Sequence, residues 1–381
     1  MSSTAPHRAL YLRWRAQTFS QIVGQEATIA TLSNAVRTGR LAHALLFVGP
    51  RGTGKTSTAR IVAKAVNCLD PRDGEPCDAC EPCVAIREGR TFDVLETNAA
   101  SNNRLEYIRD DFLLRLITAP TDLRRKVFIL DEVQRFTDAW DVLLKPLEEP
   151  PDHVLFIFCT TNPARIPPAV FSRLQRFDFR PLSEKQIAGK LRRILEADGL
   201  EADQDAIEVV ARLADGGMRD AESMLDQLLS GGVGRLTAER VRDLLGLATE
   251  ETVERFARAL VDGDALAGIG ALDTLEERGR DLRAFLDQVV DALRRAIVAA
   301  LGPAPERAAV PLADRPPTVL AAAARRVVDL DPSRLGQGGL RFALELALLA
   351  SPGPRGPALA TAALPARPAT FCSLFVDASR I

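Results

Sequence analysis

A glycine-rich segment, residues 49–57, has the residue types and spacing that hold phosphate. It follows an apolar run at 44–48 and precedes a stretch of helical character. Glycines let backbone N–H groups wrap around phosphate oxygens at a helix N-terminus, where the helix dipole favours negative charge. In this P-loop pattern Lys55 reaches the β- and γ-phosphates, and the Thr56 hydroxyl is a ligand of Mg²⁺. A glycine-rich turn without a ligand is the alternative, and the strand–loop–helix setting disfavours it. The residues expected to contact the nucleotide are Gly49, Pro50, Arg51, Gly52, Thr53, Gly54, Lys55, Thr56 and Ser57.

Two adjacent acidic residues follow a second apolar run, at 127–130. Asp131 ends the predicted strand and suits a position beside Mg²⁺, and Glu132 can polarise the water that attacks the phosphate. An acidic turn after a core strand is the alternative, but it would leave two carboxylates side by side without a cation. Together with the P-loop, the pair predicts hydrolysis of a nucleoside triphosphate.

Two arginines could complete such a site. Arg173 follows a proline pair at 167–168, where a helix would reach the rim of the domain, and Arg219 opens a later helix. A single arginine on a helix is more often solvated or ion-paired. Spacing alone therefore leaves both roles open.

Four cysteines crowd into residues 68–83, in the pattern C-x8-C-x2-C-x2-C. Four thiolates fit a tetrahedral zinc site that leaves no position open for water, so the ion would be structural. The segment is poor in apolar residues and carries three prolines, so metal binding would hold it together. An iron–sulfur cluster and uncoordinated thiols are the alternatives; the spacing lacks the last cysteine of a ferredoxin run. The predicted zinc ligands are Cys68, Cys77, Cys80 and Cys83.

Short apolar runs alternate with helical stretches over residues 1–180, and these elements must position the site. The runs are 44–48, 92–96, 126–130, 154–159 and, more weakly, 177–179. Runs that are apolar at nearly every position suit strands buried on both faces. We therefore predict an α/β domain with a parallel five-stranded sheet covered by helices.

The pattern of apolar residues changes at Pro181, and no strand-like run follows. Apolar residues recur at helical spacing over 181–245, where Ser183 is a candidate helix N-cap, and again over 246–350. The Pro- and Ala-rich stretch 303–317 is expected to be a loop, and 351–381 a flexible tail. The chain is thus expected to contain two helical domains after the α/β domain.

The charge balance and the hydropathy of the chain limit which partners it can contact. The chain carries 49 basic and 51 acidic side chains, so any contact with nucleic acid must come from a local patch. No uncharged apolar stretch is long enough to span a membrane, and arginines stand where a signal peptide needs its apolar core. We expect a cytoplasmic protein without membrane contacts.

In this order, the motifs resemble the gamma/tau subunit of bacterial DNA polymerase III, the ATPase of the sliding-clamp loader. The likeness covers roughly residues 8–245 and includes the four-cysteine insert. The motifs that carry it are 11–26, 43–57, 98–103, 143–151, 159–162 and 217–221. Gln134, Leu174 and Ala16 depart from the family pattern, which usually has histidine, cysteine and proline there, and none removes a phosphate ligand.

The resemblance implies an AAA+ nucleotide-binding domain over 1–180 with a zinc insert at 68–83, a helical lid over 181–245 and a helical collar over 246–350. It implies that Arg173 is a finger reaching into a neighbouring subunit's site and that Arg219 is a lid arginine sensing the γ-phosphate. Thr161 would be the sensor at the end of the fourth strand, and Arg104 a contact to the DNA backbone.

The implied ligands are ATP, Mg²⁺ and Zn²⁺. The implied partners are the delta and delta-prime subunits, further gamma/tau copies, the sliding clamp and primer–template DNA. ATP binding would open the clamp, and hydrolysis would release it onto DNA during replication. Another AAA+ motor such as a branch-migration helicase, a non-hydrolysing subunit like delta-prime and a plain DNA-binding module are the competing hypotheses. The polymerase-tethering domains of the longer tau form are not expected here.

Overall fold

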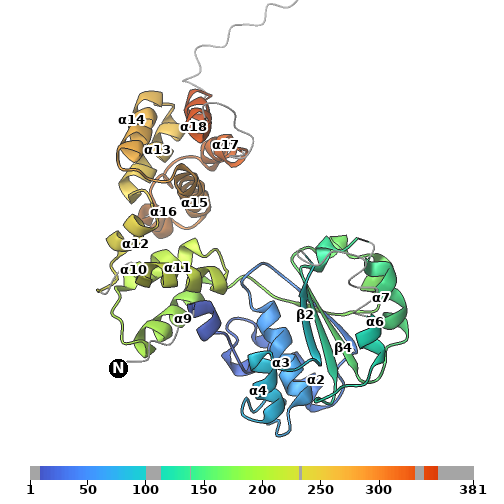
Figure 1. Cartoon of the computed structure of the whole chain (residues 1–381). Helices are drawn as coiled ribbons and strands as arrows, with labels where there is room; N and C mark the ends of the chain where they lie inside the picture. Colours follow the sequence, from blue (N-terminus) through green and yellow to red (C-terminus); the bar gives the residue numbers. More distant parts are fainter. Residues whose placement is uncertain (1–8, 100–112, 138, 231–233, 331–338, 351–381) are drawn as a thin grey trace, which may run out of the picture. The chain divides into compact units, whose positions relative to one another are not determined.

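The computed structural model describes residues 9–99, 113–137, 139–230, 234–330 and 339–350. These residues form two compact units, of which unit 1 ends at Leu245 and unit 2 begins at Gly246 (Figure 1). The predicted tail 351–381 lies outside the described residues. Among the residues described, no helix combines the length and apolar character needed to cross a bilayer.

Unit 1 contains a fully parallel five-stranded sheet, as predicted. Its strands lie in the order β2-β3-β4-β1-β5. The strands are β1 (Ala44–Val48), β2 (Val94–Asn98), β3 (Lys126–Asp131), β4 (Val154–Thr160) and β5 (Gln175–Asp178). The second strand begins two residues later than the run 92–96 indicated. Asp93 is buried and accepts the N–H groups of residues 121–123, so its side chain holds the turn that leads into β3, while Phe92 is 78% exposed.

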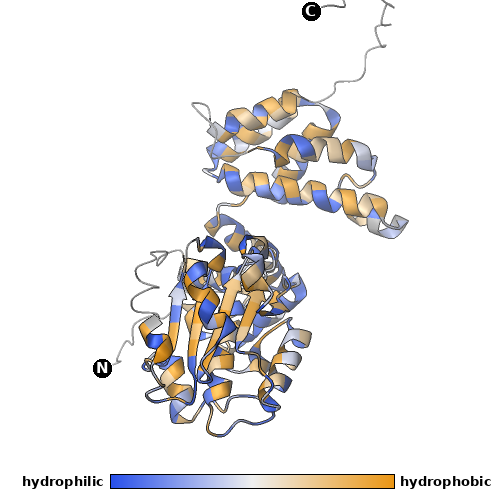
Figure 2. Ribbon diagram, turned by 90° about the vertical axis from the view of Figure 1, so that its right-hand side faces the viewer, coloured by the Kyte–Doolittle hydropathy of each residue, from blue (hydrophilic) through white to orange (hydrophobic). Residues whose placement is uncertain are grey.

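Helices cover both faces of the sheet because successive strand residues point to opposite sides. Leu45 and Phe47 belong to the core beneath α2 (Glu26–Arg37), α3 (Lys55–Asn67) and α4 (Glu81–Glu88). Leu46 belongs to the opposite core, beneath α6 (Leu113–Ile117) and α7 (Ala139–Glu148). Figure 1 shows the two groups of helices flanking the strands, and Figure 2 shows the strands as largely hydrophobic ribbons.

A helical layer completes unit 1. Ser183 caps α9 (Glu184–Ala197) through a reciprocal capping box with Gln186, which confirms the predicted N-cap. The layer continues with α10 (Gln204–Leu213), α11 (Met218–Ser230) and α12 (Ala238–Leu244), and α1 (Leu10–Arg13) packs on α11. The short elements of unit 1 are η1 (Phe19–Gln21), η3 (Val133–Arg135), η4 (Pro163–Arg165) and α8 (Pro168–Phe171).

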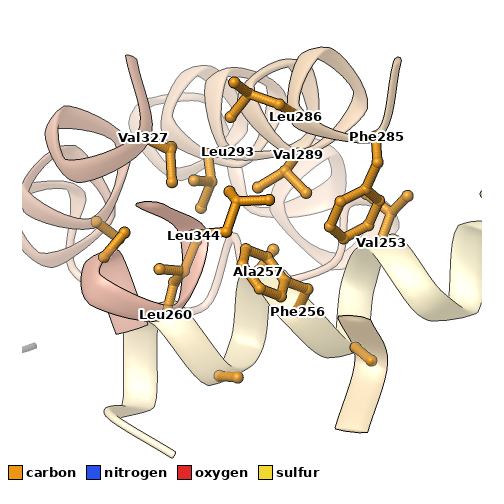
Figure 3. Close-up of a cluster of buried hydrophobic side chains, with 14 of the residues drawn as sticks. Val253, Phe256, Ala257, Leu260, Phe285, Leu286, Val289, Leu293, Val327 and Leu344 are labelled. Carbon is orange, nitrogen blue, oxygen red and sulfur yellow. The ribbon is translucent and has the colours of Figure 1, made fainter. Parts of the chain in front are cut away.

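Unit 2 is helical in its described part, as predicted. It contains α13 (Glu250–Asp262), α14 (Ala265–Glu277), α15 (Leu282–Leu301), α16 (Ala304–Ala309), α17 (Pro317–Val328) and α18 (Gly339–Leu349). The apolar stripe on α15 packs into one core with Phe256 and Leu344 (Figure 3). The prediction of a loop over 303–317 was wrong in part, because α16 forms within this stretch. Proline at the first turn of a helix forfeits no hydrogen bond and alanine favours helix, so this composition allows a short helix.

The core of unit 2 predicts a sharp contrast between two leucines of α18. Leu344 is fully buried, whereas Leu346 is 48% exposed. We expect Leu344→Ala to lower the free energy of unfolding of unit 2 by about 2–5 kcal/mol, because the substitution leaves a cavity. The matched control Leu346→Ala should change it by about 0.5 kcal/mol or less. Urea unfolding followed by circular dichroism measures both, and equal losses would contradict this packing.

Candidate nucleotide site

The P-loop joins the end of β1 to the start of α3. Gly52 and Gly54 have φ of +71° and +96°, a left-handed region that favours glycine. Lys55 is buried, and its Nζ donates to the carbonyl oxygens of Gly49 (2.7 Å) and Pro50 (2.6 Å). Burial lowers the pKa of Lys55, and the carboxylates of Asp131 and Glu132 act against this shift. The loop therefore presents a desolvated cation at a helix N-terminus.

The carboxylate pair meets the P-loop across the sheet edge. The Thr56 hydroxyl donates to Asp131 Oδ2 at 2.6 Å, and the other oxygen of Asp131 accepts the backbone N–H of Glu132 at 2.8 Å. Glu132 adopts a φ of +54°, an uncommon left-handed conformation for a residue with a Cβ. The structure thus brings together the predicted Mg²⁺ residues and the predicted base.

Gln134 connects this pair to the end of β4. Its Nε2 donates to the Glu132 carboxylate and, at 3.0 Å, to the Thr161 hydroxyl. Its Oε1 accepts from the buried Thr160 hydroxyl at 2.8 Å. In the sequence Gln134 was visible only as a departure from a family pattern. The fold makes it the link between Glu132 and the predicted sensor threonine.

A cavity of about 610 Å³ opens between the P-loop and the helical layer. Asp131, Glu132 and Arg219 line it. Gly49 and Pro50 do not, and their carbonyls hold Lys55 instead. The P-loop residues that line it are Arg51, Gly52, Thr53, Gly54, Lys55, Thr56 and Ser57, and the opposite wall includes Tyr11, Trp14, Arg15, Val23, Lys190 and Glu222.

The remaining predicted residues lie apart from this cavity. Thr161 lines a separate surface hollow with Arg51 and Arg165. The Arg173 guanidinium contacts the Glu148 carboxylate at 2.5 Å and does not line the cavity of its own chain. Arg104 lies outside the described residues.

Arg219 lines the cavity and stacks on an aromatic ring. Its guanidinium carbon is 5.0 Å from the centre of the Tyr11 ring, a cation–π arrangement. Tyr11 was part of the quoted sequence motif, but nothing in the sequence paired it with an arginine more than two hundred residues away. The pairing follows from the packing of α1 on α11.

Glu222 is a buried carboxylate that the sequence analysis missed. It lies one helical turn after Arg219 on α11, lines the cavity and is only 5% exposed. Burial raises its pKa from 4.5 to about 7, and the cations that face it, Lys190 and Arg15, act in the opposite direction. The Lys190 ammonium lies 5.3 Å from the Trp14 ring centre. A glutamate among helical residues carries no sequence signal for such burial.

The four predicted zinc ligands come together. Their sulfur atoms all lie within 4.8 Å of one another, and Cys68 Sγ is 3.8 Å from Cys80 Sγ. Sulfurs at about 2.3 Å from a tetrahedral zinc ion lie about 3.8 Å apart. The Cys77 sulfur accepts the backbone N–H of Cys80 at 3.3 Å, and N–H donors from Ala79 and Cys80 lower its pKa to about 6. Burial raises the pKa of Cys68 and of Cys83. The set is compatible with zinc because its four sulfurs converge at distances that suit one tetrahedral ion.

The fold and the site define a class. A parallel sheet with a P-loop after β1, a carboxylate pair after β3 and a helical lid is the architecture of an AAA+ P-loop NTPase. Residues 24–183 match a family model described as the DNA polymerase III delta subunit. Residues 186–234 match the ATPase lid domain of a DNA polymerase III clamp loader subunit, and 236–329 match domain III of DNA polymerase III subunits gamma and tau. The last match reaches beyond residue 245, where the sequence motifs ended.

Curated relatives agree with these matches. The chain is 40% identical to the DNA polymerase III subunit tau of Bacillus subtilis over 74% of this chain and 50% of the relative, and 36% identical to that of Escherichia coli over 78% and 46%. It is 34% identical to the subunit gamma of Buchnera aphidicola over 68% of this chain and 70% of that protein. The chain belongs to the gamma/tau family of DNA polymerase III subunits. It spans about half the length of the tau relatives.

Solved structures give a weaker likeness. The RuvB Holliday junction branch migration motor of Thermotoga maritima matches with a TM-score of 0.46 and 18% identity, over 72% of this chain and 91% of that one. A point variant of the same motor has a TM-score of 0.47 at the same identity and coverage. At this level the likeness assigns no function.

The raised pKa of Glu222 predicts a pH-dependent stability. Below pH 4.5 both folded and unfolded chains hold its proton; between 4.5 and 7 only the folded chain does, so stability falls as the pH rises. Glu222→Gln removes this ionisation. We expect unit 1 of the variant to be more stable than the wild type by about 1–3 kcal/mol at pH 8 and equally stable near pH 4.5. Thermal unfolding at both pH values measures this, and a difference independent of pH would contradict it.

Proposed function

We propose that the chain is an ATPase subunit of the DNA polymerase III clamp loader. ATP binding opens the sliding clamp, and ATP hydrolysis releases it onto primer–template DNA during chromosomal replication. The observation that carries the proposal is the hydrogen-bonded set Thr56–Asp131–Glu132 beside a buried P-loop lysine, in a chain that belongs to the gamma/tau family. Lys55, Thr56 and Asp131 would already serve a subunit that only binds nucleotide, whereas Glu132, placed beside them to orient a water, is needed only for hydrolysis.

In this proposal the backbone N–H groups of residues 51–57 and the Lys55 ammonium hold the triphosphate. Thr56 and Asp131 would hold Mg²⁺, which supplies charge neutralisation at the β- and γ-phosphate oxygens when bound. Glu132 accepts a hydrogen bond from the attacking water and orients it. Gln134 donates to the Glu132 carboxylate and fixes its orientation. Because Gln134 also donates to the Thr161 hydroxyl, a shift of Thr161 would move the Glu132 carboxylate.

The arginines have separate proposed roles. Arg219 is inside the cavity on a neutral aromatic partner, so it can exchange the Tyr11 ring for the γ-phosphate at little electrostatic cost. Arg173 is outside the cavity of its own chain, which agrees with a role in a neighbouring subunit's site. Its pairing with Glu148 would hold the guanidinium until that neighbour is in place.

The other parts of the chain receive roles from the family. Residues 1–180 form the nucleotide-binding domain, 181–245 the lid, and 246–350 the collar that assembles the ring. The zinc ion in the 68–83 insert is structural. The proposed partners are the delta and delta-prime subunits, further gamma/tau copies, the clamp and primed DNA, which Arg104 contacts; the proposed location is the cytoplasm. The family matches disfavour the branch-migration helicase.

The decisive test is the steady-state ATPase rate of the assembled complex, with and without sliding clamp and primed DNA. We expect clamp and primed DNA together to stimulate the wild type. Lys55→Ala should abolish the stimulated rate, because the triphosphate loses its buried cation. Lys185→Ala, which removes an exposed lysine of the lid, is the matched control and should keep the rate. A wild-type rate indifferent to clamp and DNA would overturn the proposal.

The same assay separates the proposed role of Arg173 from the rest. Arg173→Ala should lower the stimulated rate by about 10³-fold or more while ATP affinity stays near the wild-type value, as for arginine fingers. Mixing Arg173→Ala with Lys55→Ala subunits should restore part of the rate, because a finger and a P-loop from different chains then meet. An unchanged rate in Arg173→Ala would remove only this assignment.

The cysteine cluster predicts about one bound metal ion per chain. Elemental analysis of the purified protein should find zinc, and Cys80→Ser should lose it. Cys159→Ala is the control, because Cys159 is buried in β4 away from the cluster and its loss should leave the zinc content unchanged. Iron with visible absorption, or no metal at all, would contradict the zinc assignment.

A further inference from the structure

One wall of the nucleotide cavity consists of chain with little regular structure. Trp14, Arg15 and Ala16 line the cavity, and so do Gln21, Ile22 and Val23. These residues lie in the segment between α1 and α2, whose regular structure is limited to the three-residue helix η1 (Phe19–Gln21). The wall contributes no strand to the sheet, so other contacts must hold its position.

The cysteine insert supplies one of these contacts through Glu75. Its two carboxylate oxygens accept the backbone N–H groups of Phe19 and Ser20, each at 2.7 Å. These are charge-assisted hydrogen bonds to donors at the start of η1, and such bonds are about twice as strong as neutral ones. Two backbone hydrogen bonds with Arg72 close the turn that carries Glu75. A carboxylate of the insert thus fixes the backbone immediately before Gln21 and Ile22.

A second contact runs through a buried lysine of α3. Lys64 is 1% exposed, and its Nζ donates to Asp78 Oδ1 at 2.8 Å and to Gln17 Oε1 at 3.0 Å. Asp78 lies between Cys77 and Cys80, inside the cysteine knuckle. The amide of Gln17 in turn donates to the carbonyl oxygen of Arg15 at 3.0 Å, in the cavity wall. If Asp78 moved away, the buried ammonium would lose the carboxylate that pairs with it, at a high cost.

We propose that the cysteine insert positions the wall of the nucleotide cavity, with Glu75 and Asp78 as the positioning residues, so that metal binding and nucleotide binding are coupled. The insert is poor in apolar residues, and its four cysteine sulfurs converge at one place. Metal loss frees the knuckle, and the anchors of residues 15–22 are freed with it. Coupling is reciprocal in binding free energy, so bound nucleotide raises the affinity of the insert for its metal. This inference rests on the proposed nucleotide site.

The first test measures binding of ATP with Mg²⁺ by calorimetry on the full chain. Glu75→Gln puts an amide against one of the two N–H donors, and we expect ATP affinity to fall about fivefold or more. Its zinc content should stay at the wild-type value, and the rate at saturating ATP should stay within about twofold, because no group that touches the reacting atoms changes. Glu81→Gln, an exposed carboxylate of the same insert, is the matched control and should bind ATP normally.

The second test reads the coupling from the metal side. Equilibrium competition with a zinc-selective chelator measures the zinc affinity of the wild type, and MgATP should raise this affinity about fivefold or more. In Glu75→Gln and Asp78→Asn, MgATP should have little effect on the zinc affinity. Because every protein meets the same nucleotide, weak binding of zinc by ATP itself cancels in the comparison.

The outcomes separate this inference from the proposed function. If the wild type does not bind ATP, the proposed function fails. If the wild type binds ATP, Glu75→Gln binds ATP equally tightly, and MgATP leaves the zinc affinity of the wild type unchanged, only the positioning role is wrong. If Glu75→Gln does not fold, Asp78→Asn and the competition experiment on the wild type still decide. A zinc affinity of the wild type that does not respond to MgATP overturns the coupling.

Discussion

The parallel pairing of β3, β4 and β1 is the constraint on which the site depends. Parallel strands end at the same edge of a sheet, so the P-loop, the Asp131–Glu132 pair and the Thr160–Thr161 step meet there although they are distant in sequence. The register pairs Val48 with Thr160. The hydrogen bonds of Thr56 and Gln134 then join the three strand ends. Had one strand run antiparallel, its residues would lie at the far edge.

Two cations of the cavity, Lys55 and Arg219, are held by partners weaker than a triphosphate. Lys55 donates to two backbone carbonyls, and Arg219 lies on the Tyr11 ring, so both cations have neutral partners. A phosphate oxygen offers each a charge-assisted bond, which is stronger. Glu222, by contrast, has a raised pKa and is readily neutral near pH 7, so it adds little repulsion toward an anion. The cavity is therefore arranged to favour a polyanion without a large excess of exposed positive charge.

Local patterns predicted much of this structure, and contacts between distant segments account for the rest. The strands, the Ser183 cap and the P-loop follow from short stretches of sequence, so they were predictable. The start of β2 and helix α16 were misjudged, because the first depends on Asp93 holding residues 121–123 and the second on a few alanines after proline. Glu222 and Glu75 gave no signal, and Tyr11 belonged to a motif that did not indicate its pairing with Arg219. These roles arise from burial or from partners on other elements.

An insert held together by a metal ion would be well suited to hold an irregular wall. Ordering a loop costs conformational entropy at every residue, and a short segment without a core cannot recover that cost by burying apolar surface. Four sulfurs on one ion would fix the knuckle without a core, and two carboxylates then extend that order to residues 15–22 through hydrogen bonds. Because Lys64 is on α3, the helix that starts at the P-loop, the same anchor connects the insert to the element that follows the phosphate-binding loop. The insert is then a part of the nucleotide site that contributes no residue to its lining.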